Sequence, residues 1–555
     1  MDTQRLVLFF VFSFSLLLLW DAWQKEQQPK APTAAEAQHK GVPTPATPLA
    51  PSTPTGTGAA TGAPAAPAVP GGAASAAAAS EKVTVTTDVV IARIDALGAT
   101  LTRLELRKHK DAEDPNRDFV LLGPTHDYSA QSGLVGDGMP NHRSLWHVVP
   151  GERTLAPDAE RVEVRFWAEG PVGLRVEKTY TFHRNSYVVD VDFRLINAGS
   201  APVATYAYYQ MVRDDKAPAG QNRMMYVYNG PVYYTHERAY HKVSFSDVEK
   251  GKEDLPKDAT DGWVGIMQHY FVSAWIAPDK VHREFYARKL PDGLFAAGAI
   301  VATPRVAPGA EEAVHMKLYA GPEEQQRLKA AAPGLDLVVD FGWLTIIAWP
   351  LFAVLQFFHK ISGNWGVAII LLTISVKLLF FPLSAASYKS MAKMKLVTPR
   401  LTKIREMYAN DRARMNQAMM DLYKTEKINP LGGCFPIVVQ IPVFIALYWV
   451  LLATIELRHA PFIFWIKDLA AQDPYYVLPV LMTASMVLQT RMNPTPPDPV
   501  QAKVMKFMPF MFSVFFFFFP AGLVLYWLVN NILSILQQWQ IQRMFDRDKT
   551  AHARR

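Results

Sequence analysis

The hydrophobic and polar positions of this chain follow two different periods. Between residues 81 and 320, apolar and polar side chains alternate, as in Arg161–Phe166 and again in Val189–Phe193. A period of two is typical of half-buried antiparallel strands, and turn sequences such as Pro291-Asp292-Gly293 separate the runs. After residue 340 the chain carries long apolar stretches instead. We therefore predict a large extracytoplasmic antiparallel β-sandwich followed by a membrane α-helical bundle.

One apolar stretch contains a single full charge. Trp365–Leu383 is nineteen residues long, enough to cross a bilayer as a helix, and its only full charge is Lys377. In one interpretation the lysine extends along the helix to the lipid headgroups. In the other it lines a wet, positively charged cavity, because Thr373 and Ser384 share its helical face. Both interpretations remain open on the residues alone.

The first eighty residues divide into an anchor and a tether. Residues 1–23 form an apolar segment that ends in Trp20-Asp21-Ala22-Trp23, without the small-residue site of a cleaved signal peptide. We predict an uncleaved membrane anchor rather than a removed signal. Residues 24–80 are rich in Ala, Pro and Thr and poor in large apolar side chains. Such a segment is predicted to be a disordered linker.

The C-terminal part is predicted to hold five further spans, which form the functional core of a six-span protein. Residues 321–363 contain a short linking helix and an amphipathic helix, Gly342–Phe358, that lies at the membrane interface. The second span occupies 364–385. Residues 431–545 contain the other four spans, at Cys434–Ala453, Tyr475–Leu488, Phe507–Phe519 and Leu523–Trp539.

Basic residues set the predicted orientation. Residues 386–430 hold ten Lys or Arg against four acids, and residues 546–555 form a basic tail. Both segments are therefore predicted to be cytoplasmic, with both termini inside. Apolar residues at three- and four-residue spacings make 386–430 a helical hairpin with one apolar seam. Its charges suit lipid headgroups or, alternatively, a docking site for the ribosome and targeting factors, with candidate residues Lys389, Lys393, Lys395, Arg400, Lys403 and Arg405.

Composition excludes several classes of function. The net charge of +7 gathers in the loops named above, so orientation explains it better than direct nucleic-acid binding does. Cys434 is the only cysteine, which rules out an internal disulfide. Common metal, nucleotide and nucleophile motifs are missing from the sequence. We therefore expect no cofactor, no metal site, no catalytic residue and no enzymatic activity. The dense tyrosines of the β region favour core packing over a sugar-binding cleft.

Several motifs in order along the chain carry a family resemblance. They are Asn364-Trp365-Gly366, Met391-Ala392-Lys393-Met394, the run from Asn429 to Pro436, the run from Ala471 to Tyr476, and the run from Phe519 to Trp527. Over residues 340 to 545 the chain resembles the YidC/Oxa family of membrane protein insertases. The anchor and the outer β region are similar to the long form found in bacteria with two membranes.

The resemblance implies a function and a set of site residues. It implies an insertase and chaperone of the bacterial inner membrane that takes nascent hydrophobic segments into a hydrophilic groove and releases them laterally into lipid, alone or with the Sec translocon. The family's essential base is usually Arg, and Lys377 stands at that position. The implied groove comprises Lys377, Thr373, Gln440, Tyr526 and Trp527. The implied substrate slide comprises Phe435, Ile441, Pro442, Ser513, Phe515 and Phe516.

Two other classes of function fit the sequence less well. A secondary transporter calls for paired intramembrane acids, and the predicted spans contain no Asp or Glu partner for Lys377. The second alternative is a membrane-anchored periplasmic protein whose sandwich binds carbohydrate or resembles sugar mutarotases. That alternative rests on an analogy of fold alone.

Overall fold

The computed structural model describes residues 80–111, 114–218, 227–409, 411–426, 435–493 and 499–553. They form two compact units that divide between Val339 and Asp340, inside the segment that the sequence assigns to the linking and interfacial helices. The predicted anchor, nearly all of the predicted linker and Cys434 lie outside the described residues.

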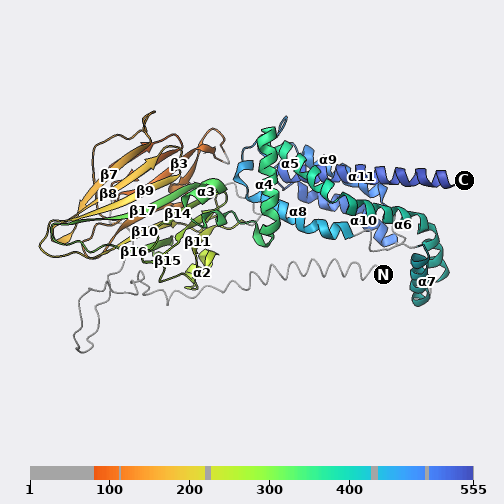
Figure 1. Ribbon diagram of the computed structural model, residues 1–555, viewed down its shortest axis with the longest axis horizontal. Helices are drawn as coiled ribbons and strands as arrows, with labels where there is room; N and C mark the ends of the chain where they lie inside the picture. Colours follow the sequence, from red (N-terminus) through yellow and green to blue (C-terminus); the bar gives the residue numbers. More distant parts are fainter. Residues whose placement is uncertain are drawn as a thin grey trace, which may run out of the picture. The chain divides into compact units, whose positions relative to one another are not determined.

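The first unit is a sandwich of two antiparallel sheets (Figure 1). The eight-stranded sheet has the order β1-β2-β3-β5-β10-β16-β15, with β4 paired to β3. Its strands are β1 (Lys82–Thr86), β2 (Val90–Asp95), β3 (Thr100–Lys110), β4 (Asp118–Leu122), β5 (Ser129–Val135), β10 (Tyr206–Arg213), β15 (Arg283–Lys289) and β16 (Phe295–Ala302).

The nine-stranded sheet has the order β12-β11-β13-β14-β17-β9-β8-β7-β6. Its strands are β6 (His147–Val148), β7 (Arg161–Glu169), β8 (Leu174–His183), β9 (Val188–Asn197), β11 (Gly230–Thr235), β12 (Ala239–Lys242), β13 (Trp263–Gln268), β14 (Phe271–Ile276) and β17 (Glu311–Pro322). Two short helices complete the unit, α2 (Phe245–Glu249) and α3 (Gln325–Ala331).

The alternating pattern does produce these strands. In β7, Val162, Val164 and Phe166 are buried while Arg161 and Arg165 are exposed. The apolar face of the strand therefore packs into the sandwich and the charged face meets water. The predicted antiparallel β-sandwich is confirmed.

The tyrosines of this unit pack rather than line an open cleft. Tyr209 points to the other sheet, where its ring lies 5.8 Å from Phe193 and 5.2 Å from Trp275. Tyr206, Tyr208 and Tyr233 are buried as well. The core-packing interpretation is confirmed for these four residues.

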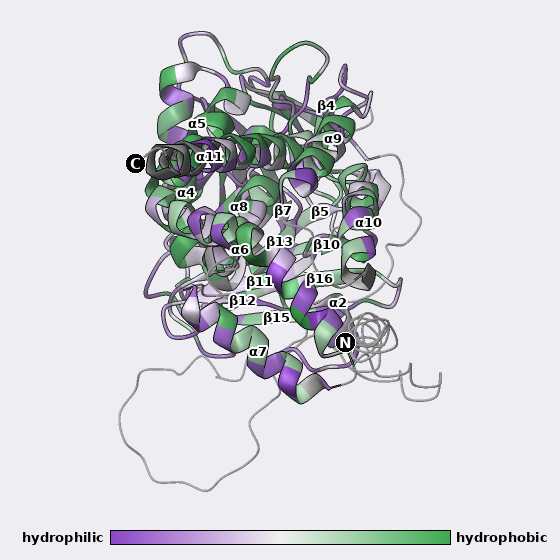
Figure 2. Ribbon diagram, turned by 90° about the vertical axis from the view of Figure 1, so that its right-hand side faces the viewer, coloured by the Kyte–Doolittle hydropathy of each residue, from purple (hydrophilic) through white to green (hydrophobic). Residues whose placement is uncertain are grey.

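The second unit is helical (Figure 1). Its helices are α4 (Thr345–Ser362), α5 (Trp365–Leu379), α6 (Phe381–Met407), α7 (Arg412–Thr425), α8 (Phe435–Ala453), α9 (Val477–Met492), α10 (Pro499–Phe516) and α11 (Ala521–Ala553). In Figure 2, α5, α8 and α9 are mostly hydrophobic, whereas α7 mixes hydrophobic and hydrophilic residues.

The apolar pattern of Trp365–Leu383 predicted one continuous helix, but the structure has two helices in this stretch. The helix ends at Leu379, and α6 begins at Phe381 with a bend of 66°. Pro382 lies in the first turn of α6, where its missing N–H costs nothing, but it cannot continue the hydrogen bonding of α5. The expected continuous helix is therefore broken at Phe380, while the assignment of a second span to 364–385 stays a prediction.

Length and hydropathy do not establish the number of spans. Among the described residues, α4 is the one single helix that is long and apolar enough to cross a membrane. The pair of α5 and the first part of α6 passes the same test only as a bent unit. In Figure 1, the axis of α4 is directed roughly at right angles to those of α8 and α11. Its placement at the interface and the count of six spans stay predictions.

The predicted apolar seam of the hairpin is confirmed. Val397 and Leu401 of α6 are buried, and they pack against residues of both helices: Met394, Met419, Leu422 and Tyr423. Asp411 caps α7 by accepting a 3.0 Å hydrogen bond from the Arg414 backbone N–H. The hairpin is therefore held by its own core as well as by its sequence propensity.

Candidate functional site

Polar side chains interrupt the apolar surface of α11 at regular intervals. Asn530, Ser534 and Gln538 stand four residues apart, so they share one face of the helix. Ser534 and Gln538 are buried and Asn530 is half-buried. Buried polar groups need partners, and these residues find them on neighbouring helices.

Lys377 is the central member of this cluster. Its side chain is only 7% exposed, and its Nζ donates a 2.7 Å hydrogen bond to the Ser534 hydroxyl. The Ser534 hydroxyl in turn donates to the Asn530 carbonyl oxygen at 2.8 Å. No ion pair joins Lys377 to a carboxylate within the part of the chain that the structure describes. Among the described residues, the ammonium is thus hydrogen-bonded to a hydroxyl rather than neutralised by an acid.

Helix α8 contributes the third side of the cluster. Gln440 donates a 2.9 Å hydrogen bond from Nε2 to the Asn530 side-chain oxygen. Tyr526, one turn before Asn530, is buried, and its hydroxyl lies beside Gln440. Thr373 is buried one turn before Lys377, but its hydroxyl bonds the Ile369 carbonyl of its own helix at 2.7 Å. Side chains of α5, α8 and α11 therefore converge on one polar cluster.

Four of the five predicted groove residues lie in or beside this cluster: Lys377, Gln440, Thr373 and Tyr526. Its three members on α11, Asn530, Ser534 and Gln538, were not predicted. The sequence does contain a signal that could have identified them, namely polar side chains four residues apart within an apolar helix. The fifth predicted residue, Trp527, points elsewhere.

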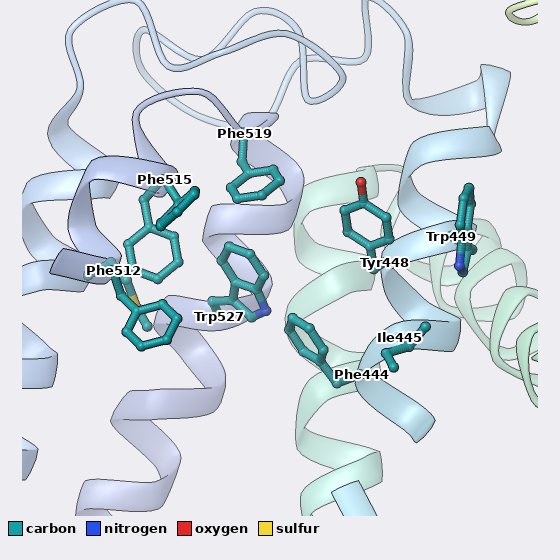
Figure 3. A pocket seen from close by; sticks show the side chains of 10 residues that line it. Phe444, Ile445, Tyr448, Trp449, Phe512, Phe515, Phe519 and Trp527 are labelled. Carbon is teal, nitrogen blue, oxygen red and sulfur yellow. The ribbon is translucent and has the colours of Figure 1, made fainter. Parts of the chain in front are cut away.

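Trp527 belongs to an aromatic pocket beside the cluster. The pocket has a volume of about 680 Å³ and is lined by Phe444, Ile445, Tyr448, Trp449, Met482, Phe512, Phe515, Phe516, Phe519 and Trp527. Trp527 stacks on Phe444 with ring centroids 5.2 Å apart, and it meets Phe516 edge-on at 4.9 Å. Figure 3 shows Trp527 between side chains of α8 on one side and of α10 on the other.

The predicted slide residues are distributed in and around this pocket. Phe515 and Phe516 line it. Ile441 is exposed and Pro442 lies inside α8, both apart from the lining residues. Ser513 is buried, with its hydroxyl on the Phe510 carbonyl at 2.7 Å. Phe435 begins α8, but its side chain lies outside the described part of the structure.

The predicted docking bases do not form a single patch. Lys389, Lys393, Arg400 and Lys403 fall within an arc of about 80° on α6, given 3.6 residues per turn. Arg400 also pairs with Glu426 of the hairpin at 2.6 Å. Arg405 lies on a different face, and the Lys395 side chain lies outside the described residues. The candidate patch is therefore the stripe of four.

One end of the helical unit is tied together by the loop between α8 and α9. Asp473 is buried there and accepts three hydrogen bonds, from the Trp465 indole at 2.9 Å, the Tyr475 backbone N–H at 3.1 Å and the Leu478 backbone N–H at 2.7 Å. A carboxylate with three donors fixes the shape of the loop. Asp473 is thus the centre of this loop.

The loop holds the first turns of α5 and α11. Asn364 donates to the Phe462 carbonyl at 3.0 Å, and a Cβ on Gly366 would lie 2.1 Å from the Phe462 ring. The backbone N–H of Ala521 donates to the Ala471 carbonyl at 2.7 Å. Lys377 lies twelve residues beyond the start of α5, or about 18 Å along it. The polar cluster is therefore well separated from the tied end.

Comparisons with known proteins agree along the whole chain. The family described as YidC periplasmic domain matches residues 82–354, and the family described as 60Kd inner membrane protein matches residues 357–549. The membrane protein insertase YidC of Nitrosospira multiformis is 52% identical over 556 residues, covering 98% of each chain. That of Methylobacillus flagellatus is 50% identical over 561 residues and covers both chains completely.

Two solved structures show a more distant similarity. A crystal structure of an active YidC insertase is 17% identical, with a TM-score of 0.38 over 82% of this chain and 91% of that one. A galactose mutarotase-related enzyme from Lactobacillus acidophilus is 10% identical, with a TM-score of 0.28 over 43% of this chain and 97% of that one.

The loop network yields a first prediction. Asp473→Ala leaves three donors without their acceptor, which we expect to lower the stability of the helical unit by about 3 kcal/mol. The measurement is thermal unfolding in neutral detergent, together with the rate of proteolysis within residues 455–476. Asp421→Ala is the matched control, since Asp421 is exposed on α7. Equal stability and equal cleavage of the two variants would contradict the role given to Asp473.

Proposed function

The chain belongs to the YidC family of membrane protein insertases, and from this premise we propose that it inserts and chaperones nascent hydrophobic segments at the bacterial inner membrane. It acts by binding and release rather than as an enzyme. The observation that carries the proposal is that the polar cluster and the aromatic pocket adjoin. Gln440 and Phe444 are one turn apart on α8, and Trp527 and Asn530 are one turn apart on α11.

The adjoining sites account for two stages of insertion. The polar cluster receives the polar or acidic part of the incoming segment, because Lys377 brings a positive charge into an apolar environment. The aromatic pocket receives the apolar part, which then leaves sideways into lipid. Transfer of apolar surface out of water provides about 25 cal/mol per Å². Neither a nucleotide nor a metal is needed for these steps.

The proposed orientation follows the distribution of charge. The hairpin of α6 and α7 and the C-terminal tail face the cytoplasm, and the β-sandwich faces the periplasm. The bundle then has six spans, five of them in the insertase core, with α4 at the interface. In this orientation the tied loop closes the periplasmic end. The polar cluster opens toward the cytoplasm, where the segments to be inserted arrive.

We propose partners on the same basis. Nascent membrane proteins are the substrates, handled alone or together with the Sec translocon. The basic stripe on α6 binds negatively charged surfaces of the ribosome or of targeting factors, and acidic lipid headgroups. It consists of Lys389, Lys393, Arg400 and Lys403. A carbohydrate-binding or mutarotase-like role for the sandwich is not favoured, because the tyrosines that suggested it are used in packing.

The second prediction concerns the charge at position 377. Lys377→Arg should keep activity, because the charge is retained. Lys377→Ala should slow insertion of substrates with acidic translocated tails about tenfold, the equivalent of about 1.4 kcal/mol of lost attraction, and Lys377→Glu should be slower still. A neutral-tailed substrate, at matched protein levels, is the control. The measurement is the insertion rate into inverted membrane vesicles.

The alternative in which Lys377 only reaches the headgroups makes a different prediction. Removing the charge would then leave insertion unchanged for both kinds of tail. Equal rates for acidic and neutral tails in all three variants would therefore overturn the electrostatic role.

The third prediction concerns the pocket. A photoreactive amino acid at Phe515 or Ile445 should crosslink to the apolar segment of an arrested nascent chain, because both positions line the pocket. Leu536 is the matched control: it is 53% exposed on α11, comparable with 46% for Phe515, but lies outside the pocket lining. Equal crosslinking from Leu536 and Phe515 would show general lipid exposure instead of a substrate path.

A further inference from the structure

The outer face of the eight-stranded sheet carries its own polar network. Alternate residues of β10 point to opposite faces, so Tyr209 enters the sandwich core while Tyr208 and Gln210 face outward. The Tyr286 hydroxyl of β15 donates to the Gln210 side-chain oxygen at 2.8 Å. These two residues meet over the intervening strand β16, where Gly298 is the register partner of both. The glycine leaves the side chains room to meet.

The segment before β6 brings two more side chains to this face. The His142 backbone N–H donates to the Tyr208 hydroxyl at 3.0 Å, and the His142 ring meets the Tyr208 ring edge-on at 5.7 Å. Arg143 is positioned by Asn141, whose side-chain oxygen accepts a 2.9 Å hydrogen bond from the Arg143 backbone N–H. Arg143 is thereby held beside Tyr208 and the outward-facing residues of β15.

Arg143 and Arg288 both have buried guanidinium nitrogens without a hydrogen-bond partner among the described residues. In each side chain Nε and Nη2 are buried and make no hydrogen bond to any residue that the structure describes. The Arg288 guanidinium lies 5.8 Å from the centre of the Tyr286 ring. The buried Arg283 offers a contrast within the same strand, since its Nε, Nη1 and Nη2 all donate to backbone carbonyls. Buried donors without partners are costly and call for an explanation.

Positive charges predominate around this site, although one buried carboxylate, Glu284, stands on the same face of β15 as Tyr286 and Arg288. Burial lowers the pKa of His142 to about 4, and the positive charges of Arg143, Arg288 and Lys178 lower it further in the same direction. His142 is therefore neutral at neutral pH, while the two guanidinium groups stay charged. Burial also lowers the pKa of Arg288, and the neighbouring Arg143 adds to that effect. The site is electropositive, with donors directed along one edge of each guanidinium group.

We propose that Arg143 and Arg288 bind an oxyanion, the carboxylate or phosphate group of a small anionic ligand, on the outer face of the eight-stranded sheet. Nε and Nη2 together form the side-on edge of a guanidinium group, and that edge matches two oxygens of a carboxylate or phosphate. Bound in this way, the ligand would satisfy four buried donors and neutralise the excess positive charge. This site is separate from membrane insertion and gives the β-sandwich a binding function of its own.

The test is calorimetric titration of the full chain in neutral detergent, with inorganic phosphate in one arm and the simple carboxylate acetate in the other. The wild-type chain should bind at least one of the two anions, and the stronger arm identifies the group. Arg143→Gln and Arg288→Gln should each weaken that binding about tenfold or more. Arg175→Gln is the matched control, because Arg175 also covers an aromatic ring, at 4.4 Å from Trp167, but is paired with Glu177. It should bind as the wild type does.

A second pair of variants distinguishes loss of the binding site from a folding defect. Arg143→Lys and Arg288→Lys keep the charge but lose the paired donors, so we expect weaker binding than the wild type with an unchanged near-ultraviolet circular dichroism spectrum. Binding of neither anion by the wild type at millimolar concentration overturns the proposal. Undiminished binding in Arg143→Gln or Arg288→Gln, or lysine variants that bind as tightly as the wild type, overturns it equally.

Discussion

The hydrogen bond from the Lys377 ammonium to Ser534 imposes an arrangement on the helices around it. An ammonium in an apolar bundle is costly unless it has polar partners, and among the described residues its partner is the Ser534 hydroxyl instead of a carboxylate. Ser534 can meet Lys377 only if the polar face of α11 turns toward α5. That same rotation directs Asn530 toward Gln440 of α8. One buried charge thus orients α11 against two neighbouring helices.

The orientation of α11 also explains why an aromatic pocket adjoins a polar cluster. Trp527 is three residues before Asn530, yet it stacks on Phe444 and closes one side of the pocket. Helix α8 packs beside α4, and α10 packs beside α9. The aromatic pocket therefore lies between α8 and α10 (Figure 3). At the far end, the loop centred on Asp473 holds α5 and α11 at their first turns. A bundle fastened at one end and polar within is suited to receive segments from the other end.

Sequence patterns predicted the parts of this fold that depend on periodicity. Alternation along β7 and spacing along α6 and α7 identify buried faces directly, since burial follows the period of the element. The break at Phe380 was missed because an apolar run has no period that a bend would interrupt, and the only local signal was Pro382. Ser534 and Asn530 were missed because hydropathy averages hide single polar residues. The resemblance grouped Trp527 with the groove, but only the direction of its ring, set by stacking on Phe444, assigns it to the pocket.

The central claim is that the polar cluster forms a wet groove open to the cytoplasm, and thiol accessibility tests it most directly. Cys434 is the only native cysteine, so Cys434→Ser provides a clean background. Asn530→Cys places a thiol in the cluster. Ile532→Cys is the control, because Ile532 is 43% exposed on the apolar face of the same helix. A charged, membrane-impermeant thiol reagent should label position 530 from the cytoplasmic side of inverted vesicles and not from the periplasmic side of spheroplasts, while position 532 stays unlabelled from both. Labelling of position 530 from the periplasmic side, or from neither side at normal protein levels, would contradict the account.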